Sequence, residues 1–491
     1  MKMKKILSIL VVLGLMAPGL AACGGNTPPP QSEATKNEAK DTAKDTTAAA
    51  ADDDEETKEA EESVEVGEND GVELEEGQTI DENGVIRNED GTIVNPEILK
   101  MDGSKLVFWS LFSGGDGEFM DKIIDSYNAT SPTKQVQSVM LVWGDYYTKF
   151  ATAVASGNAP DIGVSHASRL PELQEQGMIM EFDSYAEEAS VDWSKFTDEM
   201  NASVIFDGAH YAMPLDVHAE VMYMNLDILE EAGVTEDEVR AVKSESDFTK
   251  ILDKVKDVTA EDQTVISLPT NGDDPYRVWW AEYFQMGGTP IVNEDSSEVT
   301  LDRDIAIKAA EAVKAYYDNG YVMTGITDHG KIFQNGLAGF AWAGTWSVGA
   351  FEQSTDLNFS VAPFPSLYNG GEACWADAHT LTIPVSKTRS DEDTVAAVEF
   401  IYYAAGEGAT TWAQSGQIPA NLDVVESSGF KALTYRSGYS RAAQTAVLPP
   451  LSPVFGGLKS AIITNLDEYW SDQTDVETVV DNIIADMETE L

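Results

Sequence analysis

From residue 105 to the C-terminus, short apolar runs alternate with stretches in which apolar side chains recur every three or four positions. The apolar run at 106–109 predicts a strand, and the spacing of Phe119, Ile123 and Tyr127 predicts a helix after it. The same order then repeats twice, with strands predicted over 136–142 and 161–164. Strands that alternate with helices are typical of a parallel sheet with helices on both faces.

The same pattern resumes in the second half of the chain. Apolar runs at 221–224 and 265–268 predict two further strands. Helices are predicted in segments that end near Gly233, cover 304–317 and 391–405, and begin at Val476. For a chain of 491 residues, two α/β lobes fit better than one.

The segment 71–102 has a different pattern. Its short apolar pieces are separated by Asn83-Gly84 and Asp90-Gly91. Both pairs favour tight hairpin turns, because the two central positions of such a turn must accept a positive φ. We expect a small β-hairpin appendage here and assign it no function.

Residues 23–70 are predicted to form a disordered acidic tether. Positions 26–62 contain no aromatic residue and consist largely of Pro, Ala, Thr, Lys, Asp and Glu. Such a segment cannot bury enough apolar surface to offset its loss of conformational entropy. The acidic run 52–56 lacks the alternating spacing and turn glycine of a calcium loop, which favours a solvated charge run over a cation site.

The first 22 residues read as an export signal. Lys2, Lys4 and Lys5 precede an apolar run at 6–16 that is too short to span a bilayer permanently. The following Leu20-Ala21-Ala22-Cys23-Gly24 resembles the lipobox of bacterial lipoproteins. That resemblance implies cleavage before Cys23 and a diacylglyceryl group on its sulfur, which would anchor the protein to the cell membrane on its outer, extracellular side. The alternative is an ordinary secretory signal in which Cys23 is incidental.

Composition narrows the classes of function. The formal net charge of −54 argues against nucleic acid as a partner, because phosphates would be repelled. The chain has 2 cysteines, so lipidation of Cys23 would leave only Cys374 and no intramolecular disulfide. We expect Cys374 to be a small buried thiol. A long chain of this kind must be stabilised by the size of its core.

Several short motifs of the body occur in a specific order. They are Phe108-Trp109-Ser110, Gly114-Gly115-Asp116-Gly117, Trp143-Gly144-Asp145, 156–162, 211–218, Met222-Tyr223-Met224-Asn225, 333–336, Ala343-Gly344-Thr345-Trp346 and 375–380. Together these motifs resemble the extracellular solute-binding proteins of family 1, the sugar-type receptors of ABC importers. The resemblance covers the chain from about Lys105 to its C-terminus.

The resemblance implies an α/β architecture of the type II periplasmic-binding-protein fold. Two lobes would be joined by hinge strands, with an interlobe ligand cleft that closes on binding. By motif order, the first lobe would hold 103–215 and 380–436, and the second lobe 220–375 and 437–491. The crossing strands would be 211–218 and 375–384. The implied function is capture of a carbohydrate, with an oligosaccharide favoured, by a monomer that delivers it to the permease subunits of an ABC importer. The same fold could serve another small solute, such as a polyol, a sugar phosphate or a polyamine.

Tryptophans are the first candidates for ligand contact, because sugars present flat C–H faces that stack on aromatic rings. Trp346 lies in a segment that resembles the Gly-x-Trp ligand-contact segment of the family. The other candidates are Trp109, Trp143, Trp280 and Trp375; Trp279, Trp342 and Trp412 also merit inspection. Each could instead be a half-buried core residue. In particular, adjacent tryptophans on one helix cannot share one face.

Polar candidates would bind the hydroxyl groups. Asp116 follows two glycines at a predicted helix start, where it could contact ligand or act as a plain N-terminal cap. His166 follows the carboxyl end of a strand, the place where ligands bind in open α/β sheets. Asp216, His218 and His379 lie at the presumed crossings, where each could instead stabilise the hinge.

Other classes of protein fit the sequence less well. A glycosidase would also use aromatic side chains and paired carboxylates, but no glycosidase motif, Gly-x-Ser-x-Gly or phosphate-binding loop occurs, so we expect no enzyme and no cofactor. The 5 histidines are scattered without zincin spacing, and we expect no metal site, although a zinc receptor could gather them in space. A tethered adhesin would also use an acidic stalk but would need no hinged cleft.

Overall fold

The computed structural model describes residues 77–80, 85–88, 91–94, 103–113, 115–326, 328–368 and 371–491. The predicted signal 1–22, the lipid site Cys23 and the tether 23–70 lie outside these residues. Residues 66–491 form one compact unit, and the described part of that unit has two separate hydrophobic cores, one for each lobe. None of the helices in the described part is sufficiently long and apolar to span a bilayer.

The first lobe is built around a five-stranded mixed sheet. Its strand order is β4 (Val136–Met140), β3 (Leu106–Ser110), β5 (Ile162–His166), β14 (His379–Thr382) and β8 (Ala212–Pro214). The strands β3, β4 and β5 are parallel, whereas β14 pairs antiparallel with β5 and β8. The parallel arrangement expected for the strands predicted at 106–109, 136–142 and 161–164 is therefore confirmed, and β14, which enters from the second lobe, adds an antiparallel neighbour to β5.

Helices surround this sheet and enclose its core. They are α1 (Gly117–Ala129), α2 (Trp143–Ser156), α3 (Leu170–Glu175), α4 (Asp183–Glu188), α5 (Asp198–Ala202), α13 (Asp391–Ala405) and α14 (Ala409–Trp412). A two-stranded ribbon of β6 (Ile205–Phe206) and β7 (Ala209–His210) precedes β8. The face of α1 that carries Phe119, Ile123 and Tyr127 is buried, as its periodicity predicts.

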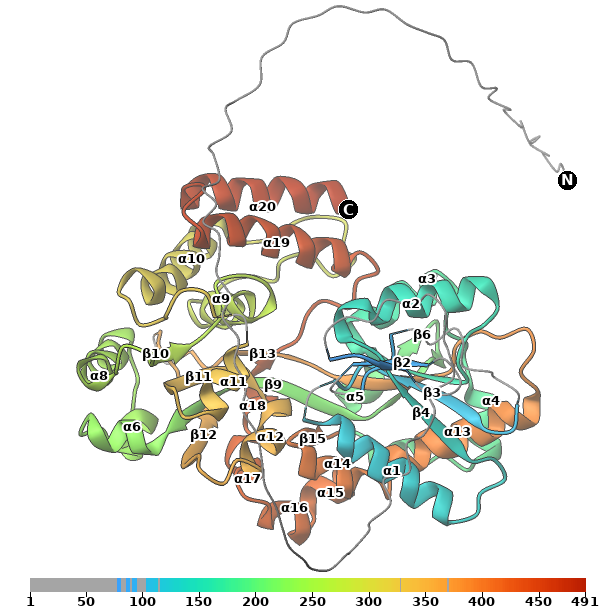
Figure 1. Cartoon of the computed structure of the whole chain (residues 1–491). Coiled ribbons are helices and arrows are strands. Elements are labelled where there is room, and N and C mark those ends of the chain that lie inside the picture. The colour runs from blue at the N-terminus through green and yellow to red at the C-terminus, as the bar shows by residue number, and fades with distance from the viewer. Residues whose placement is uncertain are drawn as a thin grey trace, which may run out of the picture. The chain divides into compact units, whose positions relative to one another are not determined.

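The second lobe has a seven-stranded mixed sheet centred on the long strand β9 (Asp216–Asn225). The other strands are β10 (Thr264–Ser267), β11 (Ala338–Gly344), β12 (Phe359–Pro363), β13 (Cys374–Asp377), β15 (Ile418–Pro419) and β16 (Ala446–Val447). In Figure 1, β9 runs from one lobe into the other. Val217 packs against both cores, so the chain crosses between lobes at the start of β9.

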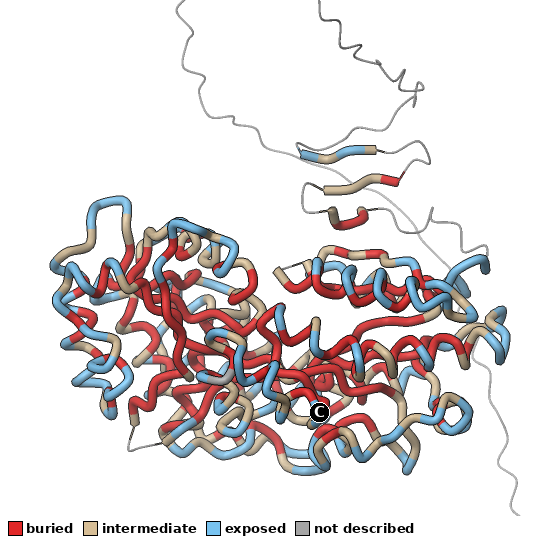
Figure 2. Tube along the Cα trace, turned by 90° about the horizontal axis from the view of Figure 1, so that it is seen from below, coloured by how far each residue is buried: buried red, intermediate tan, exposed pale blue. Residues whose placement is uncertain are grey.

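The helices of the second lobe are more numerous. They are α6 (Leu226–Glu231), α7 (Glu236–Arg240), α8 (Glu245–Val258), α9 (Asp273–Gln285), α10 (Arg303–Asp318), α11 (His329–Gln334), α12 (Val348–Glu352), α15 (Leu422–Glu426), α16 (Ser428–Ala432), α17 (Arg436–Tyr439), α18 (Ala442–Thr445), α19 (Phe455–Trp470) and α20 (Val476–Glu490). The last two pack together beside α9 and α10 (Figure 1). Figure 2 shows that buried residues line the interior of both lobes, while exposed residues lie on the outer helices and loops.

One lobe boundary differs from the sequence expectation. Residues 422–436, assigned above to the first lobe, pack on the second. Val425 and Tyr435 contact the second core, and the Tyr435 hydroxyl donates to the carbonyl oxygen of Phe359 at 3.0 Å. The buried Arg436 forms an ion pair with Glu352 at 2.6 Å. Between residues 422–436 and Trp412 of the first core the chain runs along the hinge, because Ile418 packs in the second core whereas Ala420 packs in the first and Asp423 pairs with Lys195.

The appendage expected over 71–102 is described in part. The short strands β1 (Thr79–Ile80) and β2 (Ile86–Arg87) pair antiparallel on either side of the predicted Asn83-Gly84 turn, which itself lies outside the described residues. Val85 and Ile93 join the first core, and the backbone N–H of Ile93 donates to the carbonyl of Met140 at 2.7 Å. The appendage thus attaches to the end of β4, the edge strand of the first sheet.

Candidate functional site

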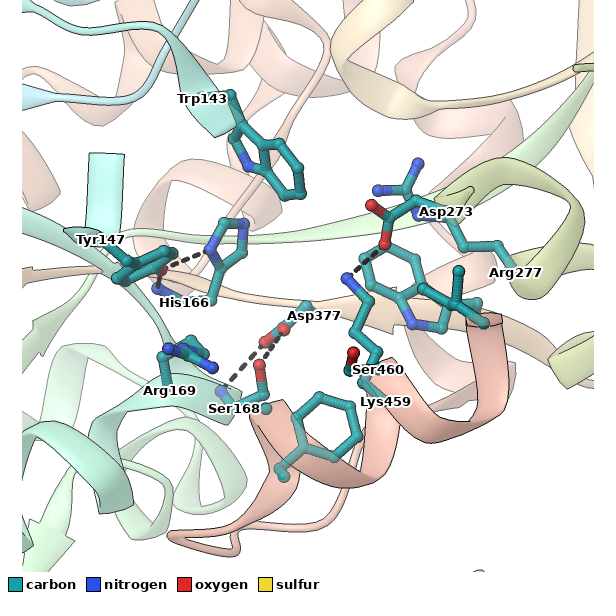
Figure 3. A pocket seen from close by; sticks show the side chains of 14 residues that line it. Trp143, Tyr147, His166, Ser168, Arg169, Asp273, Arg277, Asp377, Lys459 and Ser460 are labelled. Atoms are coloured by element: carbon teal, nitrogen blue, oxygen red, sulfur yellow. Dashed lines mark hydrogen bonds and ion pairs between the residues drawn. The ribbon is translucent and has the colours of Figure 1, made fainter. Parts of the chain in front are cut away.

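Two adjoining cavities lie between the lobes and share Trp143, His166, Asp273, Arg277 and Trp375. The hinge cavity, about 410 Å³, is also lined by Leu111, Ser113, Asp116, His218, Asp274, Trp346 and His379. The α19 cavity, about 330 Å³, is also lined by Tyr147, Ser168, Arg169, Asp377, Phe455, Gly456, Lys459, Ser460 and Ile463 (Figure 3). Both volumes are in the range of small-molecule binding pockets.

The hinge cavity has a charged network at its base, where the chain crosses between lobes. The buried carboxylate of Asp216 accepts hydrogen bonds from His379 Nδ1 at 2.9 Å and from Trp412 Nε1 at 2.6 Å, and lies 3.2 Å from His218 Nδ1. Burial alone would raise the pKa of Asp216, but the charge of His379 and the hydrogen bonds of both histidines outweigh it and hold the pKa well below its usual range. Asp216 therefore positions other groups and does not itself line the cavity.

Three of the five histidines meet at this base. The rings of His218 and His379 stack with centroids 4.0 Å apart, and the ring of His166 lies 5.4 and 5.1 Å from them. Burial and the neighbouring charge of His379 lower the pKa of His166 and of His218. For His379, burial lowers the pKa but the Asp216 carboxylate raises it further, so its pKa lies above the ordinary value. Burial thus lowers the pKa of two of the imidazoles, whereas the Asp216 carboxylate raises the pKa of the third.

Asp116 does not behave as a plain helix cap. It occupies the N-cap position of α1, yet its side chain makes no capping hydrogen bond. Instead, Gln417 Nε2 donates to Asp116 Oδ2 at 3.2 Å, while Oδ1 is buried without a partner. Burial raises the pKa of Asp116 to about 6, although the charge of His379 acts in the opposite direction. Its free oxygen belongs to a side chain that lines the hinge cavity, where it could accept a ligand hydroxyl.

Trp346 and Trp375 form an aromatic corner, with ring centroids 6.4 Å apart and planes at 85°. The Arg277 guanidinium lies over both rings, 4.9 Å from the centroid of Trp346 and 4.6 Å from that of Trp375. Trp143, at the start of α2, is 40% exposed and faces Lys459 of α19 across the α19 cavity, 5.7 Å from its Nζ. The cavities therefore present stacking surfaces from both lobes.

The cationic side chains around the cavities each have an acidic partner. Arg277 pairs with Asp274 at 2.8 Å, Arg169 pairs with Glu172 at 2.9 Å, and Lys459 forms an ion pair with Asp273 (Figure 3). Asp377 is held instead by Ser168, whose hydroxyl donates to it at 2.5 Å. The positive and negative groups at the cavities are thus close to balanced.

Contacts between the lobes close one side of the α19 cavity. Gly456, in the first turn of α19, has no side chain, and a Cβ there would collide with the Arg169 guanidinium. Glycine at this position therefore allows a side chain of the first lobe to approach the backbone of the second.

The structure brings most of the predicted site residues together. Trp143, His166, Trp346, Trp375, His218, His379 and Asp116 line the cavities, and Asp216 lies directly behind two of the histidines.

Trp109 and Trp280 are corrections to the predicted site, because neither lines the cavities. Trp109 is buried in the first core, since both faces of β3 are covered. Trp280 is buried in the second core, and its Nε1 donates to the carbonyl oxygen of Val447 at 2.9 Å. Trp279, Trp342 and Trp412 are also core residues.

Several cavity residues were not predicted from the sequence: Tyr147, Ser168, Arg169, Asp273, Arg277, Asp377 and Lys459. For three charged residues at the start of α9, the sequence did contain a usable spacing pattern. Asp273, Asp274 and Arg277 have i, i+3 and i, i+4 spacing at the start of α9, which places them on one helix face. No local pattern singled out Lys459, which lies far away in the sequence.

The family model, the related sequences and the solved structures that match this chain all point to the same family. The family model described as bacterial extracellular solute-binding protein matches residues 122–435. The maltodextrin-binding protein of Bacillus subtilis is 23% identical over 67% of this chain and 78% of its own length. An arabinooligosaccharide-binding protein of Halalkalibacterium halodurans is 25% identical over 67% of this chain and 74% of its own length. The GacH receptor of Streptomyces glaucescens, solved unliganded and with acarbose, matches with a TM-score of 0.70 and 19% identity over 79% of this chain and 98% of that one. The structural match supports the two-lobed α/β fold.

Proposed function

The chain belongs to the bacterial extracellular solute-binding proteins, and we propose that it captures a neutral oligosaccharide between its lobes for delivery to the permease of an ABC importer. The observation that carries this proposal is the aromatic corner of Trp346 and Trp375 beside the polar base of the hinge cavity. Indole rings suit the C–H faces of sugar rings, and the carboxylate and imidazole groups suit their hydroxyls. The oligosaccharide specificities of the two relatives point in the same direction.

The charges at the cavities favour an uncharged ligand. Because Arg169, Arg277 and Lys459 each have an acidic partner, a sugar phosphate would find no unpaired cation among these side chains. A polyamine would need free carboxylates, and Asp273 and Asp274 are already paired with Lys459 and Arg277. A neutral sugar can instead use these groups as hydrogen-bond donors and acceptors without breaking the ion pairs.

Transport follows from closure of the two lobes. A ligand that contacts both lobes shifts the population toward the closed state by its difference in affinity for the two states. The permease would recognise that closed state. The protein would act as a monomer, without a cofactor and without breaking any bond of its ligand. A lipid on Cys23 would keep it at the outer face of the membrane, and the tether would leave it free to rotate.

Isothermal titration calorimetry of the chain from residue 24 onward, without the lipid, tests the proposal. Neutral oligosaccharides should give heat and a change in tryptophan fluorescence, while polyamines and sugar phosphates should give none. The ligand recovered afterwards should be chemically unchanged. Binding of a charged solute alone would overturn the assignment of a neutral ligand, and a shortened oligosaccharide product would identify an enzyme instead.

A lipid-site variant tests the membrane attachment separately. Cys23→Ala should bind sugar in vitro as the wild type does, yet be released from cells and fail to support uptake. Retention of this variant at the membrane would contradict the lipoprotein assignment.

A further inference from the structure

The three histidines at the base of the hinge cavity have the arrangement of metal ligands. One ring nitrogen of each of His166, His218 and His379 lies within 4.8 Å of the corresponding atoms of the other two. They come from three strands of the crossing region: His166 ends β5, His379 begins β14 opposite it, and His218 lies near the start of β9. We propose that these three imidazoles bind a divalent transition-metal ion, with zinc as the best match.

Oxygen atoms hold the Nδ1 side of each ring. Tyr147 Oη lies 2.7 Å from His166 Nδ1, and the Asp216 carboxylate lies 3.2 Å from His218 Nδ1 and 2.9 Å from His379 Nδ1. Histidines that bind metals commonly donate their second ring N–H to a carboxylate or another oxygen, which fixes the tautomer and the ring orientation. Here one buried carboxylate does this for two rings.

The Nε2 atoms are thereby left for a ligand. Within the described residues, no protein group makes a hydrogen bond to Nε2 of His166, His218 or His379, and all three side chains line the hinge cavity. A metal ion binds Nε2 in its deprotonated form, so binding at these atoms would release any proton that they carry. Three such nitrogens in one cavity form the donor set that zinc, copper and nickel prefer over magnesium or calcium.

The geometry requires a small contraction. Tetrahedral zinc with Zn–N bonds of about 2.0–2.1 Å places its ligand nitrogens about 3.4 Å apart, whereas one nitrogen of each ring lies within 4.8 Å of those of the other two rings in this structure. His166 belongs to the first sheet, and His218 to the strand that enters the second lobe, so movement at the hinge changes the distance between their rings. The ion would bind most tightly in a more closed arrangement of the strands.

A fourth ligand position opens toward the rest of the cavity. A water molecule or a hydroxyl group of a bound solute would take this position, as in sites with three protein ligands. The buried Oδ1 of Asp116, which lines the same cavity without a protein partner, could accept a hydrogen bond from that group. The metal site would then lie within the carbohydrate cavity proposed above, although its existence does not depend on that function.

The test is Zn²⁺ titration of the purified chain from residue 24 onward after treatment with chelator and exchange into chelator-free buffer with excess Mg²⁺. We expect one tight Zn²⁺ per chain and, with Co²⁺ as a spectroscopic probe, the visible absorption of a tetrahedral or five-coordinate ion. His166→Gln and His218→Gln should each weaken binding at least tenfold. Asp216→Asn should weaken it about 10- to 100-fold by releasing two of the rings.

His210→Gln is the matched control. The Nδ1 of His210 also lies close to a carboxylate, 2.6 Å from Asp183, but its ring stacks on Trp193 in the first lobe and lies outside both cavities. This variant should bind Zn²⁺ like the wild type. Absence of a tight site in the wild type would overturn the proposal, as would equal losses in His210→Gln and His166→Gln. The Co²⁺ spectrum of the wild type tests the site even if a variant fails to fold.

Sugar titrations of the same samples separate the two proposals. If sugars bind in the presence of chelator while Zn²⁺ shows no tight site, the metal proposal fails and the receptor function stands. If Zn²⁺ binds and no oligosaccharide gives heat with or without it, the receptor proposal fails and the metal site stands.

Discussion

Asp216 and Glu220 lie four residues apart on β9, and both side chains are completely buried. Around Asp216, His379 and Trp412 supply hydrogen bonds, and its pKa lies well below the usual range. Around Glu220, neither carboxylate oxygen has a hydrogen-bond partner. Burial raises the pKa of Glu220 to about 8, although the charge of Arg277 opposes this effect.

The difference shows that one strand can hold two buried carboxylates in opposite environments, one with hydrogen-bond donors and one without. At the hinge end of β9, side chains from the first lobe and from the crossing strands converge on Asp216 and provide it with donors. Farther along, Glu220 pairs in register with Gly344 inside the second sheet, where the charge of Arg277 acts on its carboxylate but no group donates a hydrogen bond to it. A carboxylate is retained as an ion only where the surrounding elements provide donors.

The largest effect on the free energy of unfolding is expected when the charge of Asp216, at the hinge end of β9, is removed. Asp216→Asn should lower the free energy of unfolding by about 3–5 kcal/mol, because the charge of His379 would lose its buried partner. Urea unfolding measures this change. The matched control is Asp423→Asn, whose exposed carboxylate pairs with Lys195 and should matter little. A loss below 1 kcal/mol for Asp216→Asn would contradict the central role of this carboxylate.

A third buried carboxylate, Glu282, tests whether an uncharged hydrogen-bond donor is enough to keep a buried carboxylate ionised. Glu282 accepts from the Tyr316 hydroxyl at 2.9 Å, yet burial raises its pKa from 4.5 to about 8. Between these pH values the folded state binds more protons than the unfolded state, so the contribution of Glu282 to stability falls as the pH rises. Glu282→Gln should remove this fall and gain about 3 kcal/mol relative to the wild type between pH 5 and pH 8.

Urea unfolding of both proteins across this pH range gives the measurement. Glu230→Gln, an exposed substitution in α6 of the same lobe, provides the control and should follow the wild type. A constant difference between Glu282→Gln and the wild type would show that Glu282 is already ionised at pH 5.

The aromatic corner of Trp346 and Trp375 lies close to the part of β9 between Asp216 and Glu220. Trp346 follows Gly344, the partner of Glu220, by two residues and packs edge-on against His218 with centroids 5.8 Å apart. Trp346→Ala should weaken sugar binding by about 1–3 kcal/mol through loss of stacking surface. Calorimetry measures this change, with Trp193→Ala as the control because Trp193 stacks on His210 outside the cavities. Equal affinity in wild type and Trp346→Ala would remove Trp346 from the site.

The smallest effect is expected at the unpaired end of β9. At pH 5, where burial keeps Glu220 protonated in the folded state because its pKa is about 8, Glu220→Gln should change the free energy of unfolding by less than about 1 kcal/mol, since no hydrogen bond of the side chain is lost. Urea unfolding of Glu220→Gln and of Asp216→Asn under the same conditions compares the two positions directly. A loss above 2 kcal/mol would show that Glu220 is ionised and paired with Arg277.

The sequence was most informative where a local pattern is sufficient. The strand predicted over 161–164 corresponds to β5, and the helix predicted over 391–405 matches α13 at both ends. The order of the short motifs identified the family, and seven of the ten predicted ligand-contact residues line the cavities. These features depend on periodicity and on residue types that the chemistry of sugar binding requires.

It was least informative where partners lie far apart in the chain. Trp280 was predicted as a ligand contact beside Trp346, but α9 is buried on several sides and Trp280 faces the core. No local sequence pattern in residues 422–436 predicts which lobe they contact. Lys459 and Arg169 reach the cavity only because α19 approaches the first lobe.

By itself the sequence determined the family, the two-lobed α/β architecture and the kinds of side chain at the site, because these follow from local hydrophobic periodicity and short motifs. Only the tertiary structure decided that His166, His218 and His379 share one cavity and that Asp216 holds two of them. Their positions are separated by as many as 213 residues, the interval from 166 to 379. Strands β5, β9 and β14 bring the three rings together, where Asp216 contacts two of them and Tyr147 the third, and no local pattern in the chain encodes that convergence.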